Sequence, residues 1–346
     1  MSEANKIEEL NNIEEPLNLE EVITALTLHP DLTSKNWVFE QLNPTEAKNM
    51  ASDAGIVEIE TTEKAMALST AGNTKFLEAS AFEGSMIAVA EAVRKIVCSG
   101  ARPTGISADL NFGNAKNSGV SEAFTDAVSG IKLAAEKVKA KITGNDLVFD
   151  QRKSISSSAV TIAAMGILDN KRTLTTLPFR AKGDLIFMVG KGQNDISSSD
   201  YLSAFHGVEK APAPFLNLDY EFDTHQTIRN LIASGIVQSC HSITNGGLFM
   251  CLFEKCLHNE LGFDITLPIE YRRDAFLFGE SQSRAVITIK EDDHELLLEL
   301  MSKESAPLLM LGHVTKSEMR IDNEGYGYID EIKPVYTNAL SETLKK

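Results

Sequence analysis

The sequence has few cysteines, little positive charge and no long apolar run. Its four cysteines, Cys98, Cys240, Cys251 and Cys256, are scattered, and none of their spacings is that of a Cys-x-x-Cys redox or zinc element. We expect them to be reduced and mostly buried. There are 33 basic against 49 acidic residues, a net charge of −16. That balance disfavours binding of nucleic acid through bulk charge, so no nucleic-acid partner is expected.

A membrane segment and a targeting signal are also missing. The longest mainly apolar stretch runs from Ala159 to Leu168 and contains Gly166, far short of the roughly 18 residues that predict a membrane span. The first residues, Met1 to Glu9, are acidic and precede no apolar segment, which disfavours a secretory signal or a transit peptide. The expected location is cytoplasmic, with no membrane partner.

Several common catalytic motifs are absent. The sequence has no Gly-x-x-x-x-Gly-Lys-Ser/Thr phosphate loop and no Gly-x-Gly-x-x-Gly after a strand, so any nucleotide site must be of another kind. It also lacks a Gly-x-Ser-x-Gly elbow, which leaves nucleophilic catalysis without support. His241, next to Cys240, is more typical of a core or capping histidine than of a base.

Composition and length predict a folded protein of two domains. Hydrophobic residues make up 43% of the 346 positions, which is ordinary for a globular chain. We expect a lead-in over 1–18, an N-terminal domain over 19–172 and a C-terminal domain over 173–346, with the polar stretch 169–176 as linker. Strands and helices alternate, which indicates α/β or α+β layering.

Periodicity gives the individual elements. In the first domain we predict a helix over 19–28, an extended segment over 34–39, strands over 55–60 and 65–69, a helix through 86–97 capped by Gly100, a loop over 109–114, a helix over 121–139 and a strand over 159–168. In the second we predict strands over 185–189, 285–289 and 307–311, and helices over 224–234, 247–258 and 294–301.

Three polar groups could carry chemistry. In Thr143-Gly144-Asn145, glycine lets the backbone approach a phosphate and the asparagine carbonyl can bind Mg²⁺, although Gly-Asn is also a common turn. The segment 241–247 opens a helix, which suits an anion or a capped loop equally well. The cluster Glu280, Ser281, Gln282, Ser283 and Arg284 needs partners, either a ligand or one another.

In this order, these groups resemble the second half of formylglycinamide ribonucleotide amidotransferase, also called phosphoribosylformylglycinamidine synthase (PurL), a synthetase of purine biosynthesis. The similarity covers nearly the whole chain. It is carried by the segment 29–41, the loop Leu110-Asn111-Phe112-Gly113-Asn114, Gly144-Asn145, the Asn-Gly-Gly of 245–247 and Gly279-Glu280-Ser281-Gln282-Ser283-Arg284.

The resemblance implies the fold of aminoimidazole ribonucleotide synthetase (PurM): an N-terminal α/β domain that pairs with a second copy into a barrel, then a C-terminal α/β domain. It implies ATP and Mg²⁺, with Asp109, Gly144 and Asn145 at the nucleotide and Asn145 at the metal. The implied partners are a second copy or a PurL first module, forming a homodimer or heterodimer, together with a glutaminase (PurQ) and a PurS-type subunit.

The resemblance also implies an ATP-dependent carbon–nitrogen ligase. In that family ATP phosphorylates the amide oxygen of formylglycinamide ribonucleotide, and ammonia then displaces phosphate to give the amidine. The family's catalytic histidines lie in the first module, which this sequence lacks. The isolated chain is therefore not expected to be active.

Departures from the family pattern favour a weakened nucleotide site. Asp146 and Leu147 replace Val-Ser after Gly-Asn, Ala108 replaces an aspartate, and Ser242 and Asn245 replace two more. Loss of oxygen ligands weakens binding of a hard cation. Two alternatives stay open: a non-catalytic homologue acting as a pairing or scaffold subunit, and a homodimeric small-molecule kinase or synthetase of the wider superfamily, which would need its own metal-binding aspartates.

Overall fold

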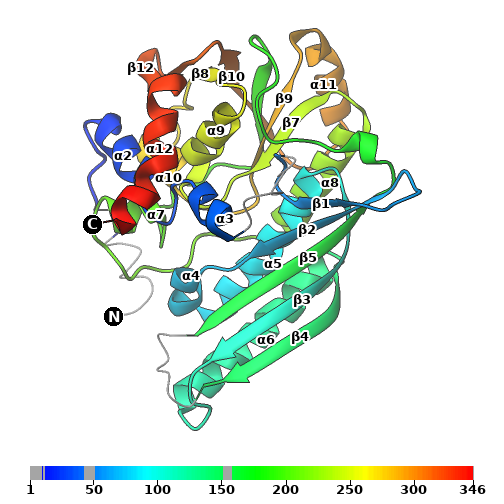
Figure 1. Cartoon of the computed structure of the whole chain (residues 1–346), viewed down its shortest axis with the longest axis vertical. Coiled ribbons are helices and arrows are strands. Elements are labelled where there is room, and N and C mark those ends of the chain that lie inside the picture. Colours follow the sequence, from blue (N-terminus) through cyan, green and yellow to red (C-terminus); the bar gives the residue numbers. More distant parts are fainter. Residues whose placement is uncertain (1–9, 11, 43–50, 151–157, 346) are drawn as a thin grey trace.

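The computed structural model describes residues 10, 12–42, 51–150 and 158–345. They form two sheets with helices packed on them (Figure 1). This confirms the predicted mixed α/β class with two domains. The four cysteines are unpaired and buried, as expected. None of the described helices is both long and apolar enough to cross a membrane.

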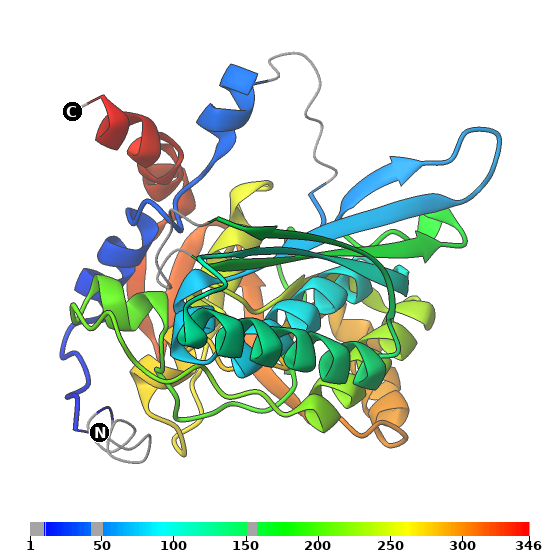
Figure 2. The ribbon, with the colours of Figure 1, turned by 90° about the horizontal axis from the view of Figure 1, so that it is seen from below.

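The first sheet has one covered and one open face. Helices α5 (Ala81–Cys98) and α6 (Ser118–Lys137) lie against the same side (Figure 2). The strands alternate accordingly, with small residues such as Ala65 and Ala67 buried toward the helices and Leu68, the residue after Ala67, exposed on the other face. The strand order is β1 (Gly55–Glu58), β2 (Ala65–Ala71), β5 (Ala159–Leu168), β3 (Arg102–Phe112), β4 (Lys141–Phe149), antiparallel except for β3 with β4.

The caps of α5 explain its bounds. Ser80 accepts a hydrogen bond from the backbone N–H of Glu83 at the start. Gly100 follows the end with φ of +84°, the left-handed conformation predicted from the sequence. A short helix, α4 (Thr74–Ala79), precedes α5 and is capped by Asn73.

The second sheet is covered on both faces. In β6 (Leu185–Val189), Ile186 and Met188 pack into one apolar core and Phe187 into another, so the whole strand is buried. The sheet order is β12 (Glu324–Tyr328), β11 (Glu318–Ile321), β8 (Gly262–Ile265), β10 (Leu308–Thr315), β6, β9 (Ala285–Ile289), β7 (Val237–Ser242). The helices are α7 (Asp200–Ala204), α8 (Leu218–Ala233), α9 (Gly247–Leu257), α10 (Arg273–Phe278), α11 (His294–Met301) and α12 (Ile329–Leu344).

The N-terminal helices belong with the second sheet. The predicted division assigned 19–172 to the first domain, whereas α2 (Leu19–Thr27) contributes Val22 and Leu26 to the core formed around α9. Helix α3 (Asn36–Leu42) lies beside α12, and the predicted extended segment 34–39 was wrong. Contacts with residues distant in sequence place α2 in the core around α9 and α3 beside α12. Part of the predicted lead-in is also docked, because Leu10 is buried in the same core.

Two predicted loops are strands. Asp109 to Phe112 form the end of β3, and Gly144-Asn145 lie inside β4. The reason is visible in the alternation of β3: Ala108, Leu110 and Phe112 are buried, and the polar residues between them face the open side. The sequence prediction also missed β7, β8, β11, β12 and α12.

Contact between α5 and α6 yields a test of this packing. A Cβ at Gly130 would lie 2.2 Å from the carbonyl oxygen of Phe82. Alanine gains about 1 kcal/mol of helix propensity over glycine. The obstructing atoms belong to the backbone and cannot turn aside, so we take the upper part of the usual overpacking cost, about 2–3 kcal/mol. We expect Gly130→Ala to lower the free energy of urea unfolding by about 1–2 kcal/mol. Ser129→Ala, at an exposed neighbour, should change it by less than about 0.5 kcal/mol; equal effects would contradict this packing.

Candidate functional site at the domain junction

A cleft of about 360 Å³ opens where the two domains meet. The first sheet contributes the end of β2 and the start of β5, and the second domain contributes the loop before α9. It is lined by Asp31, Leu32, Thr70, Ala71, Gly72, Glu91, Lys95, Thr161, Thr244, Asn245 and Glu254. We call this space the junction cleft.

The junction cleft is acidic. Asp31, Glu91 and Glu254 face a single lysine, Lys95. Lys95 is already engaged, since its Nζ lies 2.6 Å from Oε1 of Glu91 and donates to the carbonyl of Thr70 at 3.2 Å. A phosphate entering here would need a cation to offset the carboxylates. Across the described ranges, no three His, Cys, Asp or Glu side chains are grouped to hold one by themselves.

Beside the cleft, His241 lies between two carboxylates. Its Nδ1 is 2.5 Å from Oδ1 of Asp53, and its Nε2 is 2.8 Å from Oε2 of Glu254. Burial alone would lower the pKa of His241, but the two carboxylates outweigh burial and raise it to about 9. Burial would likewise raise the pKa of Asp53, yet His241 and the N–H of Ser242 lower it. The imidazole is thus a fixed cation that joins the domains and is not available as a base.

A buried carboxyl group of the protein bonds the loop 241–247. Oε1 of Glu280 accepts from the backbone N–H of Gly246 at 2.9 Å and of Asp200 at 2.7 Å, at the starts of α9 and α7. The next N–H, of Gly247, bonds to the carbonyl of Thr244. Burial and the neighbouring Asp200 raise the pKa of Glu280 well above its ordinary value. A carboxyl of the protein therefore fills the position that the sequence offered to an external anion.

Other residues of the cluster also bond within the fold. Arg284 donates to the carbonyls of Gly279 at 2.7 Å and Ser281 at 2.9 Å, which fixes the turn that leads into β9. Gln282 accepts from Arg94 of α5 at 2.8 Å. Glu280, Ser281, Gln282 and Arg284 are all buried. Mutual pairing accounts for the cluster only in part, because Oε2 of Glu280, Oγ of Ser281 and Nη1 of Arg284 are buried without a hydrogen-bond partner among the described residues.

Arg94 connects this cluster to the first domain. Its Nη1 lies 2.5 Å from Oε1 of Glu221 on α8, and neither side chain is exposed. Glu221 also bonds His225 at 2.7 Å. Burial would raise the pKa of Glu221, but Arg94 and His225 outweigh it and lower the pKa to about 2. A full ion pair therefore lies in the apolar space between α5 and α8.

The predicted nucleotide residues lie outside the cleft. Asp109 pairs in register with Thr161, which lines the cleft, and on its other side with Asp146. Gly144 pairs with Ser107 on the same open face. Asn145 pairs with the buried Ala108, so its side chain belongs to the opposite face. The structure brings Asp109 and Gly144 to one face and separates Asn145 from them.

Sequence reasoning missed the residues that hold the junction. No local sequence pattern marks Asp53 and Glu254, because only the fold brings them to His241. Arg94 is marked by its position in the sequence: it lies on the apolar face of the predicted helix, eight residues after Met86 and four after Ala90. A charge in such a row indicates a buried partner.

Comparison with known families identifies both domains. The chain matches the family described as AIR synthase related protein, with its N-terminal domain over residues 51–168 and its C-terminal domain over residues 181–322.

The curated relatives are longer than this chain. It is 32% identical over 333 residues to the phosphoribosylformylglycinamidine synthase subunit PurL of Alkaliphilus metalliredigens, covering 92% of this chain and 45% of that protein. The corresponding subunit of Moorella thermoacetica is 32% identical over 297 residues, covering 84% and 40%. The chain therefore spans less than half the length of these relatives.

Solved structures share the fold. PurL of Thermotoga maritima complexed with FGAR superimposes with a TM-score of 0.77 at 15% identity, covering 95% of this chain and 56% of that one. The same protein complexed with ATP gives 0.73 at 14% identity, covering 96% and 54%. A chain of a HypE–HypF complex gives 0.63 at 18% identity and is covered over 95% of its length.

The buried ion pair gives one prediction. Arg94→Met leaves Glu221 as an uncompensated buried charge, and we expect the free energy of unfolding to fall by about 3–5 kcal/mol. The double variant Arg94→Met/Glu221→Gln should recover a substantial part of that loss. As a control, Lys137→Met removes an exposed ion pair with Asp219 and should cost less than about 1 kcal/mol. Urea unfolding measures all three, and similar losses in Arg94→Met and the control would contradict the assignment.

His241 gives a pH-dependent prediction. Its pKa is raised from 6.5 to about 9 on folding, so its stabilisation is fully present below pH 6.5 and is lost as pH rises through 9. The stability advantage of the wild type over His241→Gln should shrink across this interval by about 1–3 kcal/mol. An exposed histidine variant, His258→Gln, serves as control. A wild-type advantage over His241→Gln that does not change with pH would contradict the prediction.

Proposed function

Because the chain belongs to the AIR synthase related protein family, through both of that family's domains, we propose that it is a module of phosphoribosylformylglycinamidine synthase that works with a second module. The observation that carries this proposal is an uncovered sheet face in a chain less than half as long as its PurL relatives. The part of each relative that this chain does not match is long enough for another module of similar size.

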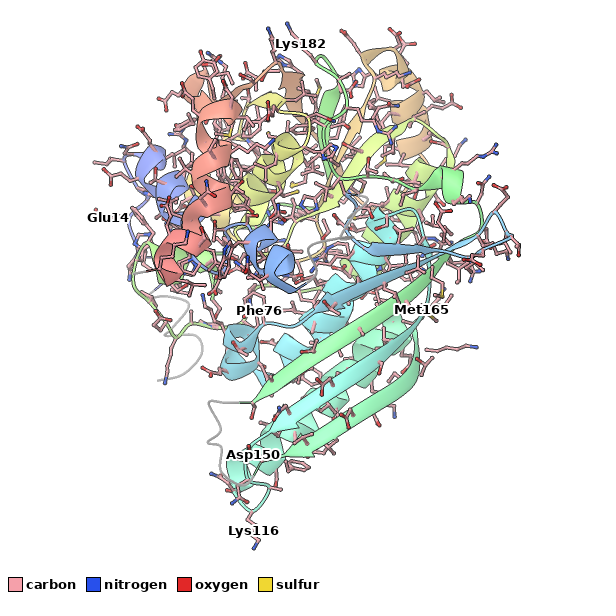
Figure 3. All side chains as sticks on the ribbon, in the orientation of Figure 1. Glu14, Phe76, Lys116, Asp150, Met165 and Lys182 are labelled. Atoms are coloured by element: carbon pink, nitrogen blue, oxygen red, sulfur yellow. The ribbon has the colours of Figure 1, made fainter. Side chains whose placement is uncertain are left out.

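The open face of the first sheet is suited to pairing. Val57, Leu68, Met165 and Val148 expose 47%, 45%, 37% and 45% of their surface, on β1, β2, β5 and β4. Leu68 and Met165 are direct cross-strand partners, and Met165 is labelled on this sheet in Figure 3. An apolar face of this extent is typical of a protein interface. We propose that a second copy, or a PurL first module, covers it.

The proposed reaction needs groups from that partner. By the family resemblance, ATP phosphorylates the amide oxygen of formylglycinamide ribonucleotide, ADP leaves, and ammonia then attacks the activated carbon and expels phosphate. The first module supplies the catalytic histidines. A glutaminase and a small third subunit would complete the assembly, as in the PurLQS structure from Thermotoga maritima.

In this proposal, the chain contributes few of the contacts that bind Mg·ATP. The acidic junction cleft and its engaged lysine do not suit a nucleotide phosphate. Any contact to a nucleotide falls to Asp109 and Gly144 on the open face, because Asn145 belongs to the opposite face. We propose that the metal and the triphosphate are held chiefly by the partner module.

A second candidate function rests on the same cleft. If the family chemistry is lost altogether, the chain is a non-catalytic subunit that pairs with a synthase. The acidic lining of the cleft and its already paired lysine favour this function. The two functions differ in whether a complex with a first module forms the amidine.

Native mass spectrometry with and without Mg·ATP tests the proposal. At about 10 μM, the full chain should be a dimer that retains no Mg²⁺-dependent nucleotide, because the pairing face is apolar and the cleft is acidic. Leu68→Lys/Met165→Lys should give a monomer, since two charges would be buried in the interface. The matched control, Val128→Lys/Leu133→Lys on exposed positions of α6, should stay dimeric.

A monomeric wild type would contradict pairing through this face. Micromolar Mg²⁺-dependent binding of ATP by the isolated chain would contradict the loss of the nucleotide site and would support a complete synthetase.

A further inference from the structure

A second cavity, of about 630 Å³, lies between the linker and the ends of α5 and α8. It shares no residue with the junction cleft. Its walls come from Gly100 after α5, the segment 169–175 and residues 229–238 at the end of α8 and the start of β7. We call it the arginine cavity, because Arg102, Arg172, Arg180 and Arg229 all line it.

The side chains that line this cavity are mainly positive, whereas the chain as a whole is negative. Four arginines and one acidic residue, Asp169, line it, in a protein of net charge −16. Arg102 is 3.9 Å from Asp169, and Arg172 is 3.9 Å from Glu63. Asp169 is also shared with Lys64 at 3.5 Å. Within the described part of the chain, Arg180 and Arg229 make neither an ion pair nor a hydrogen bond.

The helix ends do not account for these arginines. The C-terminal ends of α5 and α8 direct partial negative charge toward the cavity, of about half a charge each. Their last carbonyls are already bonded: Ser99 and Gly100 donate back to α5, and Ser234 and Gly235 donate back to α8. Two half-charges together with Asp169 and Glu63 still leave the four guanidinium groups with an excess of positive charge.

We propose that the arginine cavity binds a phosphorylated small molecule of nucleotide size. Guanidinium groups pair with phosphate oxygens in bidentate fashion, and their planes stack on rings. The cavity's volume lies within the range of about 300–1,000 Å³ that is usual for small-molecule sites. Ile167, Ile232 and Val237 supply an apolar wall, and Asn230 and Gln238 supply amides for a polar ring.

The ligand would touch both domains. Arg102 belongs to the first sheet, Arg229 belongs to α8 of the second domain, and Arg172 and Arg180 flank the linker between them. None of these residues lines the junction cleft. Arg102 shares the open face of the first sheet, in one cross-strand row with Ile167, Met66 and Val57. Arg180 and Arg229 lie outside that sheet, so substituting them tests the proposed site independently of the pairing face and of the synthase function.

Isothermal titration calorimetry of the full chain tests the proposal. The probes are inorganic pyrophosphate, ADP and citrate, each in excess EDTA so that Mg²⁺-dependent binding elsewhere does not contribute. We expect ADP to bind more tightly than pyrophosphate, because its ring gains the apolar wall. Arg180→Gln/Arg229→Gln should weaken ADP binding by at least about tenfold, through loss of two charged hydrogen-bonding groups. Lys210→Gln/Lys303→Gln makes the same change of charge at exposed positions outside the cavity and should leave binding within about twofold.

Retention of the melting temperature in Arg180→Gln/Arg229→Gln would show that the fold is intact, since neither arginine side chain has a partner among the described residues. Three results would overturn the proposal: no binding of ADP or pyrophosphate by the wild type, an equal loss in the lysine control, or citrate binding as tightly as ADP.

Discussion

The buried ion pair of Arg94 and Glu221 is the constraint on which the arrangement of the two domains depends. Two charges without solvent contact are tolerated only when each meets the other. Helices α5 and α8 must therefore lie at one distance and in one register. Arg94 also bonds Gln282 and approaches the carbonyl of Ile243, so the same side chain positions the turn before β9 and the loop before α9. The junction cleft takes its shape from that alignment.

Around this pair, several charged groups of the junction pair with one another. Glu280 bonds the N-termini of two helices, His241 is held by Asp53 and Glu254, and Lys95 is held by Glu91. The cleft that remains is lined by Asp31, Glu91 and Glu254, and its one lysine is already paired. This excess of negative charge is the physical basis for proposing that a partner module carries most of the family's nucleotide chemistry. The arginine cavity is the opposite case, because its positive groups exceed their acidic neighbours.

The sequence predicted those elements whose pattern is local. The helix through Met86 and Val97 with its cap at Gly100, and the strands at 159–168 and 285–289, follow from apolar spacing and from one left-handed glycine. The ends of β3 and β4 were missed because their asparagines and glycines are common in turns. Helix α3 was missed because its position is set by contact with α12. The polar cluster at 280–284 was found, and its role was left open between ligand and structure.

The sequence by itself determined the family, the α/β class, two domains and the loss of carboxylates at the motif positions. Residue types and their order along the chain are enough to establish these features. Only the tertiary structure decided that residues 19–32 pack with the second domain, that Glu280 fills its own helix N-termini, and that Asn145 and Asp109 occupy opposite faces. It also brought together four arginines drawn from positions 102 to 229. Which side chains are buried, how the strands pair and which charges are neighbours depend on residues far apart in sequence. The order of residues along the chain does not give the distances between them in space.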